Sequence, residues 1–339
     1  MQTDVLKDLN ELQRKAAEHI HGPLLIVAGP GSGKTRVITH RIAYLVDTCG
    51  LSPRRIAAVT FTNKAAREMR LRLTGLLGQR AENLTAATFH SFCAMVLRRD
   101  GERMGLDRDF AIYDEADQVA LLKRAMTETG VDPKNWGVRA IQSAISSAKS
   151  QLIDSFDFAE RRDSYFDEIV HRVYERYDAL LVQAMAVDFD DILLRAYRLL
   201  GKFPDVAEKY QQRYLHFLVD EFQDTNVAQY AIARQMAALH NNLCVVGDPD
   251  QSIYSWRNAD IRNLLSFRRD FPGATEITLD QSYRSTKTIL GAAQRVIRPG
   301  SRAVDKRLWT ENEEGPPVVV AEGYDEQEEA QKVLQEVQA

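Results

Sequence analysis

Short apolar runs, separated by turn-forming residues, dominate the first ninety positions of the chain. Three of them, "LLIVAG" at 24–29, "IAAVTF" at 56–61 and "LTAATF" at 84–89, have the length and apolar content of strands buried on both faces. The second run is followed by "NKAAREMRLRLTGLL", in which apolar residues recur at helical spacing. Strands that alternate with helices predict a parallel sheet with crossover helices, and therefore an α/β fold.

The pattern changes between about residues 90 and 212. Apolar residues there recur at steps of three and four, which predicts amphipathic helices, and no strand-like run interrupts them. One such row consists of Ile169, Val173, Tyr177, Leu180 and Ala184. We therefore expect a helical insertion within the α/β fold.

Strand-like runs return after this insertion. They are "HFLVD" at 216–220, "LCVVGD" at 243–248, "TEITL" at 275–279 and "PPVVVAEG" at 316–323. The last run is followed by the helical pattern "DEQEEAQKVLQEVQ". The sheet is therefore expected to combine segments from both sides of the insertion.

Composition and charge limit the function classes. The chain has 339 residues, of which 45% are hydrophobic and 27% charged, as is ordinary for a soluble globular protein. The formal net charge of -4 gives no general basic field, so a polyanionic partner must be held by local patches. Cys49, Cys93 and Cys244 are far apart in sequence, which favours reduced thiols in a cytoplasmic protein. No apolar run approaches about 18 residues, so we expect no membrane span.

The stretch "AGPGSGKT" at 28–35 lies between an apolar strand and a helical pattern, which is the context of a phosphate-binding P-loop. Its glycines let successive backbone N–H groups face phosphate oxygens, and the following helix adds its positive N-terminal end. Lys34 is expected to reach the β- and γ-phosphates, and Thr35 to hold Mg²⁺. The other residues expected to bind the nucleotide here are Gly29, Gly31, Ser32 and Gly33. A plain solvated turn is the less favoured interpretation.

A pair of acids at the end of another strand completes this chemistry. In "HFLVDEFQDT", Asp220 is expected to hold the metal and Glu221 to act as the general base that activates water. Such a base favours hydrolysis over phosphate transfer by a small-molecule kinase. A guanine-reading motif is not formed, because Ala66 occupies the position of its acid.

Aromatic and polar residues follow two of the early strands. Phe61 and Asn63 come after the second strand, and Thr88, Phe89 and His90 after the third. Such residues at one sheet edge can form a surface on which single-stranded nucleic acid stacks. Two alternatives remain open at this point: Phe89 as a core residue, and His90 as a structural hydrogen-bonding residue.

The segment "GDPDQSIYSWRNAD" at 247–260 combines both kinds of signal. Gln251 follows a strand end near the acids and can contact the γ-phosphate, while Tyr254, Trp256 and Arg257 offer flat π-faces and a cation. One short segment can thereby couple the phosphate state to the grip on a base, as a translocating motor requires. The alternative is that Trp256 anchors the core.

Seven stretches occur together in the order of one known family. They are "LNELQRKA", "AGPGSGKTRV", "AVTFTNKAAREMR", "ATFHSF", "LVDEFQDTN", "VGDPDQSIYSWRNAD" and "LDQSYRS". On these motifs the chain resembles the superfamily 1 DNA helicases of the UvrD/Rep/PcrA type. The resemblance implies a P-loop RecA-like parallel sheet with a helical insertion subdomain and the start of a second RecA-like domain. The implied ranges are 1–86 and 213–280 for the first RecA-like domain, 87–212 for the insertion and 281–339 for the second.

The resemblance also implies a mechanism: ATP- and Mg²⁺-dependent movement 3′ to 5′ on single-stranded DNA, with unwinding at single/double-strand junctions. It implies that Gln13 reads adenine, that Arg36 and Tyr283 sandwich the base, and that Gln251 and Arg284 contact the γ-phosphate. The DNA contacts that it implies are Phe61, Asn63, Thr88, His90, Phe189, Tyr254, Trp256 and Arg257. A role in DNA repair or replication follows from the same resemblance.

Two features depart from the family pattern. Asn258 stands where relatives often have glycine, and the chain ends at Ala339, whereas family members continue through the second RecA-like domain. We therefore expect weak activity from this polypeptide alone. The alternatives are a nucleotide- and DNA-binding fragment without useful turnover, and the motor half of a helicase–nuclease.

Overall fold

A parallel sheet of six strands forms the centre of the computed structural model, which describes residues 5–161, 163–297 and 307–338. The strand order is β3-β2-β6-β7-β1-β8. The strands are β1 (Leu24–Ala28), β2 (Ile56–Thr60), β3 (Thr85–Thr88), β6 (His216–Val219), β7 (Leu243–Gly247) and β8 (Thr275–Leu279). The six runs that the sequence predicts as strands up to residue 279 are thus confirmed, and so is the α/β class.

Alternate strand residues face two hydrophobic cores, one on each side of the sheet. Helices α1 (Glu11–Glu18), α2 (Lys34–Asp47) and α3 (Asn63–Leu77) cover one face. The other face is covered by α4 (Phe89–Asp100), α9 (Phe189–Lys202), α10 (Pro204–Arg213), α11 (Val227–Ala237) and α12 (Arg262–Asp270). The four central strands, β1, β2, β6 and β7, are therefore buried on both faces, as their continuous apolar runs require, and the edge strands β3 and β8 are partly exposed.

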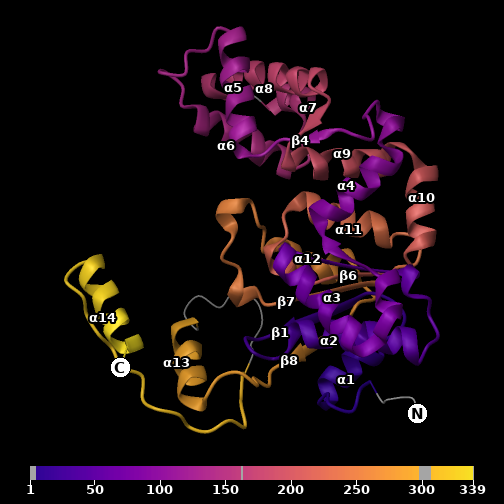
Figure 1. The fold of residues 1–339 in the computed structure, drawn as a ribbon, viewed down its shortest axis with the longest axis vertical. Helices are drawn as coiled ribbons and strands as arrows, with labels where there is room; N and C mark the ends of the chain where they lie inside the picture. The colour runs from indigo at the N-terminus through magenta and orange to yellow at the C-terminus, as the bar shows by residue number, and fades with distance from the viewer. Residues whose placement is uncertain (1–4, 162, 298–306, 339) are drawn as a thin grey trace.

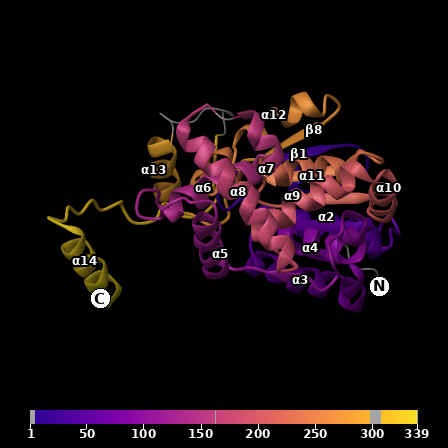
Figure 2. The ribbon, with the colours of Figure 1, turned by 90° about the horizontal axis from the view of Figure 1, so that it is seen from above.

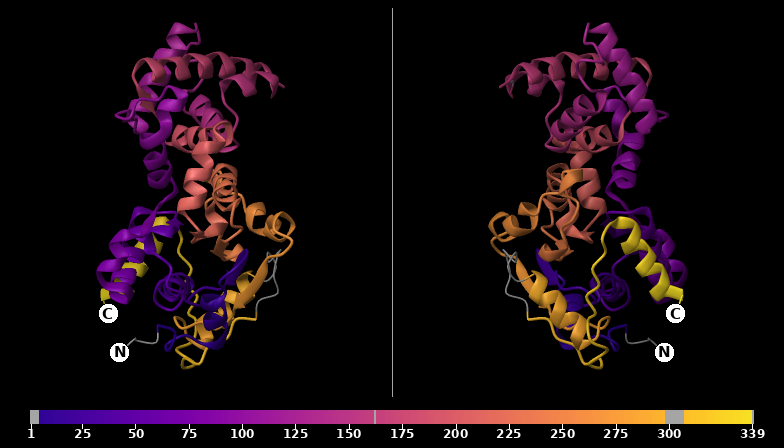
Figure 3. Two further views of the ribbon diagram at one scale, coloured as in Figure 1. Left: turned by 90° about the vertical axis from the view of Figure 1, so that its right-hand side faces the viewer. Right: turned by 90° about the vertical axis from the view of Figure 1, so that its left-hand side faces the viewer.

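The predicted helical insertion divides between two cores. Its first and last helices, α4, α9 and α10, pack on the sheet. Helices α5 (Glu115–Glu128), α6 (Val138–Ser150), α7 (Ser155–Phe158) and α8 (Tyr165–Gln183) surround a separate core. This second body is drawn above the sheet in Figure 1, and the side views in Figure 3 show the same separation. In Figure 2, which looks down from above, the insertion helices overlie the sheet.

Two expectations about strands are wrong. The insertion contains a short parallel pair, β4 (Ala111–Ile112) with β5 (Ala186–Val187), because two-residue strands are too short to produce a detectable pattern. Residues 316–323 form no strand, although their composition suggests one. Val319 and Val320 are 84% and 91% exposed, and no described strand pairs with them to satisfy their backbone groups.

The C-terminal part runs along the sheet edge and then away from it. After β8, Gln281 pairs with Trp309, and helix α13 (Lys287–Ile297) follows. Helix α14 (Glu326–Gln338) forms where the sequence predicts a helix, has no buried residue and lies apart from the sheet (Figure 1). Among the described residues, no helix is both long enough and apolar enough for a membrane span.

Candidate nucleotide and nucleic-acid sites

The phosphate-binding loop joins strand β1 to helix α2. Gly31 (φ 75°) and Gly33 (φ 85°) have positive φ angles, which side chains disfavour. A Cβ atom at Gly31 would also lie 2.6 Å from Cβ of Arg284, so the segment after β8 approaches the loop closely at a glycine. The loop therefore has the curled backbone that phosphate binding requires, directly before the first turn of α2.

A cavity of about 490 Å³ opens beside this loop, within the size range of small-ligand sites. Its lining comes from the loop and the start of α2, from α3, from the segments that follow β6 and β7, and from the segment after β8. The predicted site residues that line it are Gly29, Gly31, Gly33, Lys34, Thr35, Arg36, Glu221, Gln251, Tyr283 and Arg284. The cavity thus brings together residues that precede the insertion in the sequence and residues that follow it.

The three residues predicted to contact adenine differ in how deeply they are buried. Arg36 and Tyr283 line the cavity, and the Tyr283 backbone N–H donates to the Gly31 carbonyl (2.9 Å). Gln13 lies behind the loop, 1% exposed, and its amide nitrogen donates to the Ser32 carbonyl (2.9 Å). Gln13 thus supports the P-loop from helix α1.

The metal-binding residues predicted from the sequence are in contact. Thr35 at the start of α2 donates its hydroxyl to Asp220 Oδ2 (3.1 Å) at the end of β6. Burial and the neighbouring Glu221 raise the pKa of Asp220 to about 6, because both disfavour its charged form. A hydroxyl beside a buried carboxylate suits Mg²⁺, which takes oxygen ligands and keeps waters and phosphate oxygens in its coordination sphere.

Glu221 has an unusual backbone conformation for a non-glycine residue, with φ 51° and ψ 47°. Its Oε2 lies 3.6 Å from Nζ of Lys34. Gln223 donates its amide N–H to the same Oε2 (2.9 Å). The carboxylate is therefore held at the cavity by a cation and an amide.

The sequence analysis missed two residues near the cavity. The side-chain oxygen Oε1 of Gln223 accepts the backbone N–H of Asp248 (3.0 Å), so one buried side-chain amide connects Glu221 to the loop after β7. In the sequence, the feature that could have indicated Gln223 is its position two residues after Glu221, the predicted general base. Arg72 lines the cavity from α3 and has no sequence motif that marks it. Gln251 Nε2 donates to Asp248 Oδ2 (2.5 Å), which fixes Gln251 to the same loop.

An aromatic row begins next to this loop. The rings of Phe61 and Tyr254 have centroids 5.0 Å apart, and those of Tyr254 and Trp256 are 6.2 Å apart. Trp256 is 70% exposed, so its interpretation as a core anchor is wrong. The side chain of Arg257 lies outside the described part of the structure. Asn63 is the exposed first residue of α3, after the same strand end as Phe61.

A second aromatic pair joins α4 and α9. His90 and Phe189 meet edge to face, with ring centroids 5.9 Å apart, and Phe189 is 47% exposed. Burial lowers the pKa of His90 to about 4, so the imidazole is neutral at pH 7. Thr88 caps α4 by accepting the Ser91 N–H (3.1 Å). Phe89 is 2% exposed, which confirms its interpretation as a core residue.

This geometry defines a class of protein: a P-loop protein with a RecA-like parallel sheet, whose nucleotide cavity is linked by one loop to an aromatic row that ends in an exposed tryptophan. Two family models match the chain. The UvrD/REP helicase N-terminal domain matches residues 9–272, and the UvrD-like helicase C-terminal domain matches residues 277–339. The chain belongs to the UvrD/REP helicase family.

Curated relatives agree with this assignment. The chain is 47% identical over 329 residues to the ATP-dependent DNA helicase PcrA of Bacillus subtilis, covering 97% of this chain and 44% of the relative. It is 45% identical to PcrA of Staphylococcus aureus and 44% identical to that of Staphylococcus epidermidis, over 98% of this chain and 46% of each relative. The chain thus spans less than half the length of these relatives.

Proposed function

We propose that the chain carries the ATP-hydrolysing motor part of a DNA helicase that moves 3′ to 5′ along single-stranded DNA. The observation that carries this proposal is the loop after β7. Gln251 on this loop lines the nucleotide cavity, and the half-buried Tyr254 and the exposed Trp256 on the same loop belong to the aromatic row. A change at the γ-phosphate can therefore reach a base-stacking surface through a few residues.

The residues around the cavity have complementary roles in this proposal. Lys34 neutralises the β- and γ-phosphates of bound ATP, and Glu221 accepts the proton of the attacking water. Gln251 and Arg284 contact the γ-phosphate from two sides of the cavity. Thr35 and Asp220 would hold Mg²⁺, which supplies charge neutralisation for the phosphates when it is bound.

The contact between Lys34 and Glu221 gives binding a definite consequence. The ammonium of Lys34 faces the carboxylate of Glu221 at 3.6 Å. Phosphate binding draws the ammonium away, and Glu221 keeps only the Gln223 amide as its hydrogen-bond donor at Oε2. We infer that ATP thereby releases the base for water activation, while Gln223 holds it in orientation.

The proposal includes the arrangement of domains and the partners. Residues 1–86 and 213–280 form the first RecA-like domain, 87–212 the insertion, and 281–339 the start of the second RecA-like domain. The nucleic-acid partner is single-stranded DNA and its junctions with duplex, contacted by the aromatic row and by His90 and Phe189. The biological setting that we propose is DNA repair.

Reciprocal coupling between the two ligands tests this proposal. A motor must hold DNA with different affinity in different nucleotide states, and typical coupling changes affinity by about 5–150-fold. Fluorescence anisotropy of a labelled oligothymidylate should therefore give different Kd values with and without a non-hydrolysable ATP analogue and Mg²⁺. Equal Kd values would contradict the motor proposal and would favour a nucleotide- and DNA-binding module without turnover. After ATP is added, movement 3′ to 5′ should quench a dye at the 5′ end with a lag that grows with oligonucleotide length, and a dye at the 3′ end should show no such lag. The reverse pattern would contradict the polarity.

A further inference from the structure

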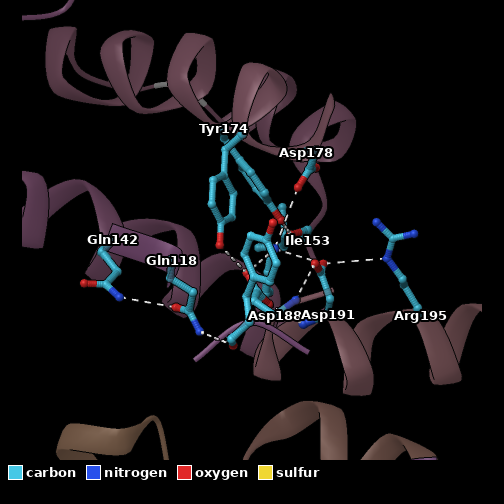
Figure 4. A network of polar contacts seen from close by, with 11 residues as sticks. Gln118, Gln142, Ile153, Tyr174, Asp178, Asp188, Asp191 and Arg195 are labelled. Atoms are coloured by element: carbon cyan, nitrogen blue, oxygen red, sulfur yellow. Dashed lines mark hydrogen bonds and ion pairs between the residues drawn. The ribbon is translucent and has the colours of Figure 1, made fainter. Parts of the chain in front are cut away.

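Lys149, near the end of α6, is a fully buried charge that the sequence analysis did not identify. Its Nζ lies 2.8 Å from Asp188 Oδ2 and 2.9 Å from Asp191 Oδ1, and its side chain has no exposed surface. Asp178 adds a third carboxylate at 3.7 Å. Figure 4 shows Asp178 on one helix and Asp188 and Asp191 at the start of another, all directed toward the same point.

The partners of Lys149 belong to two different cores. Helices α6 and α8, which carry Lys149 and Asp178, surround the core of the insertion. Helix α9, which Asp188 precedes, packs in the core of the sheet. Tyr177 of α8 reinforces the connection by donating its hydroxyl to Asp188 Oδ2 (3.0 Å). The buried ion cluster therefore ties the insertion to the helix that leads back to the sheet.

The ammonium of Lys149 keeps its charge in the fold. Burial alone would lower the pKa of the Lys149 ammonium, but the carboxylates of Asp188 and Asp191 outweigh burial and hold that pKa well above its ordinary value. A buried ion pair is often no more stabilising than apolar residues of similar volume. We therefore infer the function of this ion cluster from the part of the structure that it holds in place.

The group that it fixes is the N-terminus of α9. Asp188 is the N-cap of this helix: its Oδ1 accepts the Asp191 N–H (2.7 Å), and its own N–H donates to Asp191 Oδ2 (3.2 Å). The next residue is Phe189, half exposed, with its ring against His90. The carboxylate that binds Lys149 thus belongs to the residue directly before Phe189.

We propose that Lys149 is a positioning residue for single-stranded DNA, because it locks the start of α9 so that Phe189 and His90 present a preformed edge to a base. The inference rests on the proposed function of this face. Without the ammonium, the Asp188 carboxylate loses its buried cation and keeps only neutral donors, so the first turn of α9 is held less firmly. DNA binding then has to order Phe189, which lowers affinity.

A double-mutant cycle tests this role with oligothymidylate anisotropy on the full 339-residue chain. The variants are Lys149→Met, Phe189→Ala and the double variant. Stacking contributions predict that Phe189→Ala weakens binding about 5–150-fold. Lys149→Met should weaken binding by at least about threefold and no more than Phe189→Ala, since positioning is only part of the stacking contribution. In the double variant Lys149→Met should have no further effect, since it acts through Phe189. Lys209→Met, at an exposed ion pair with Asp100, should leave affinity unchanged.

The outcomes separate the inference from the function on which it rests. If Phe189→Ala leaves DNA affinity unchanged, the proposed nucleic-acid surface is wrong at this position. The positioning role is wrong if Phe189→Ala weakens DNA binding but Lys149→Met has no effect. It is also wrong if the two substitutions weaken binding independently, so that the loss in the double variant is the sum of the two single losses in free energy. ATP-analogue affinity should stay constant in all variants. Should Lys149→Met fail to show a cooperative thermal transition, Tyr177→Phe replaces it in the same cycle, because it removes one bond to Asp188 and leaves no charge unpaired.

Discussion

Replacing Glu221 by glutamine is expected to slow ATP hydrolysis and to strengthen nucleotide binding. The amide has the shape of the carboxylate but cannot take a proton from water, so hydrolysis should fall by about 10²–10⁴-fold, the usual contribution of a general base. Binding should improve, because the variant removes the negative charge that faces Lys34 at 3.6 Å and competes with the phosphates for it.

The size of the binding effect follows from the exposure of this ion pair. The side chain of Glu221 is 33% exposed and that of Lys34 is 10% exposed, so solvent screens the pair and its contribution is about 0.2–1 kcal/mol. Loss of this competing contact corresponds to roughly 1.5–5-fold tighter ATP binding. The repulsion that raises the pKa of Asp220 also decreases, which favours the metal-binding carboxylate form.

Calorimetric titration with a non-hydrolysable ATP analogue and Mg²⁺ measures binding, and phosphate release measures turnover. Glu102→Gln is the matched control, since this acid is 60% exposed and pairs with Arg108 in the insertion. It should change neither quantity. Phosphate release by Glu221→Gln near the parent rate would refute Glu221 as the base, and ATP binding weakened tenfold would refute the proposed competition for Lys34.

Four further outcomes are expected. Lys34→Ala should weaken ATP-analogue binding at least about tenfold in the same titration, since a charge-assisted contact to phosphate is lost. Trp256→Ala should weaken oligothymidylate binding by about 1–3 kcal/mol while the melting temperature stays unchanged, because the ring is 70% exposed. Gln223→Leu should reduce the effect of the ATP analogue on DNA affinity, measured by anisotropy, by cutting the bridge between Glu221 and Asp248. Burial, with a contribution from Arg41, lowers the pKa of His216 to about 3, so the unfolded chain binds a proton that the folded one does not. Stability should therefore fall by about 2 kcal/mol as pH drops from roughly 6.5 to 5, and urea unfolding of His216→Asn should show a smaller fall.

Local patterns predicted the sheet and the P-loop because both depend on near neighbours in sequence. The run before Gly29 is apolar throughout, and the glycines that follow are needed for a backbone shape that the chain forms locally. The meeting of Glu221 and Gln251 at one cavity could also be expected, since the carboxyl ends of parallel strands share one edge of a sheet.

What the sequence could not show depends on contacts across long separations. Gln223 reads as one more polar residue in "DEFQD" until its partner, the backbone of Asp248, is known. Arg72 lies on an exposed helix face whose proximity to the cavity is a matter of tertiary packing. The two-residue pair formed by β4 and β5 has no periodicity to detect, whereas residues 316–323 have strand-like composition without a described partner strand.

Two buried cations show how remote charges can set the position of residues that contact ligands. Arg41 of α2 donates to the carbonyls of Ala16 and His19, at the C-terminal end of the helix that carries Gln13. Its charge matches the negative end of that helix, so α1 is fixed against the helix that begins with the P-loop lysine. Lys149 acts at the opposite kind of terminus, through the carboxylate that caps α9. In both cases a charge with no solvent contact fixes a helix end, and the proposed ligand contact lies within about two turns of that end.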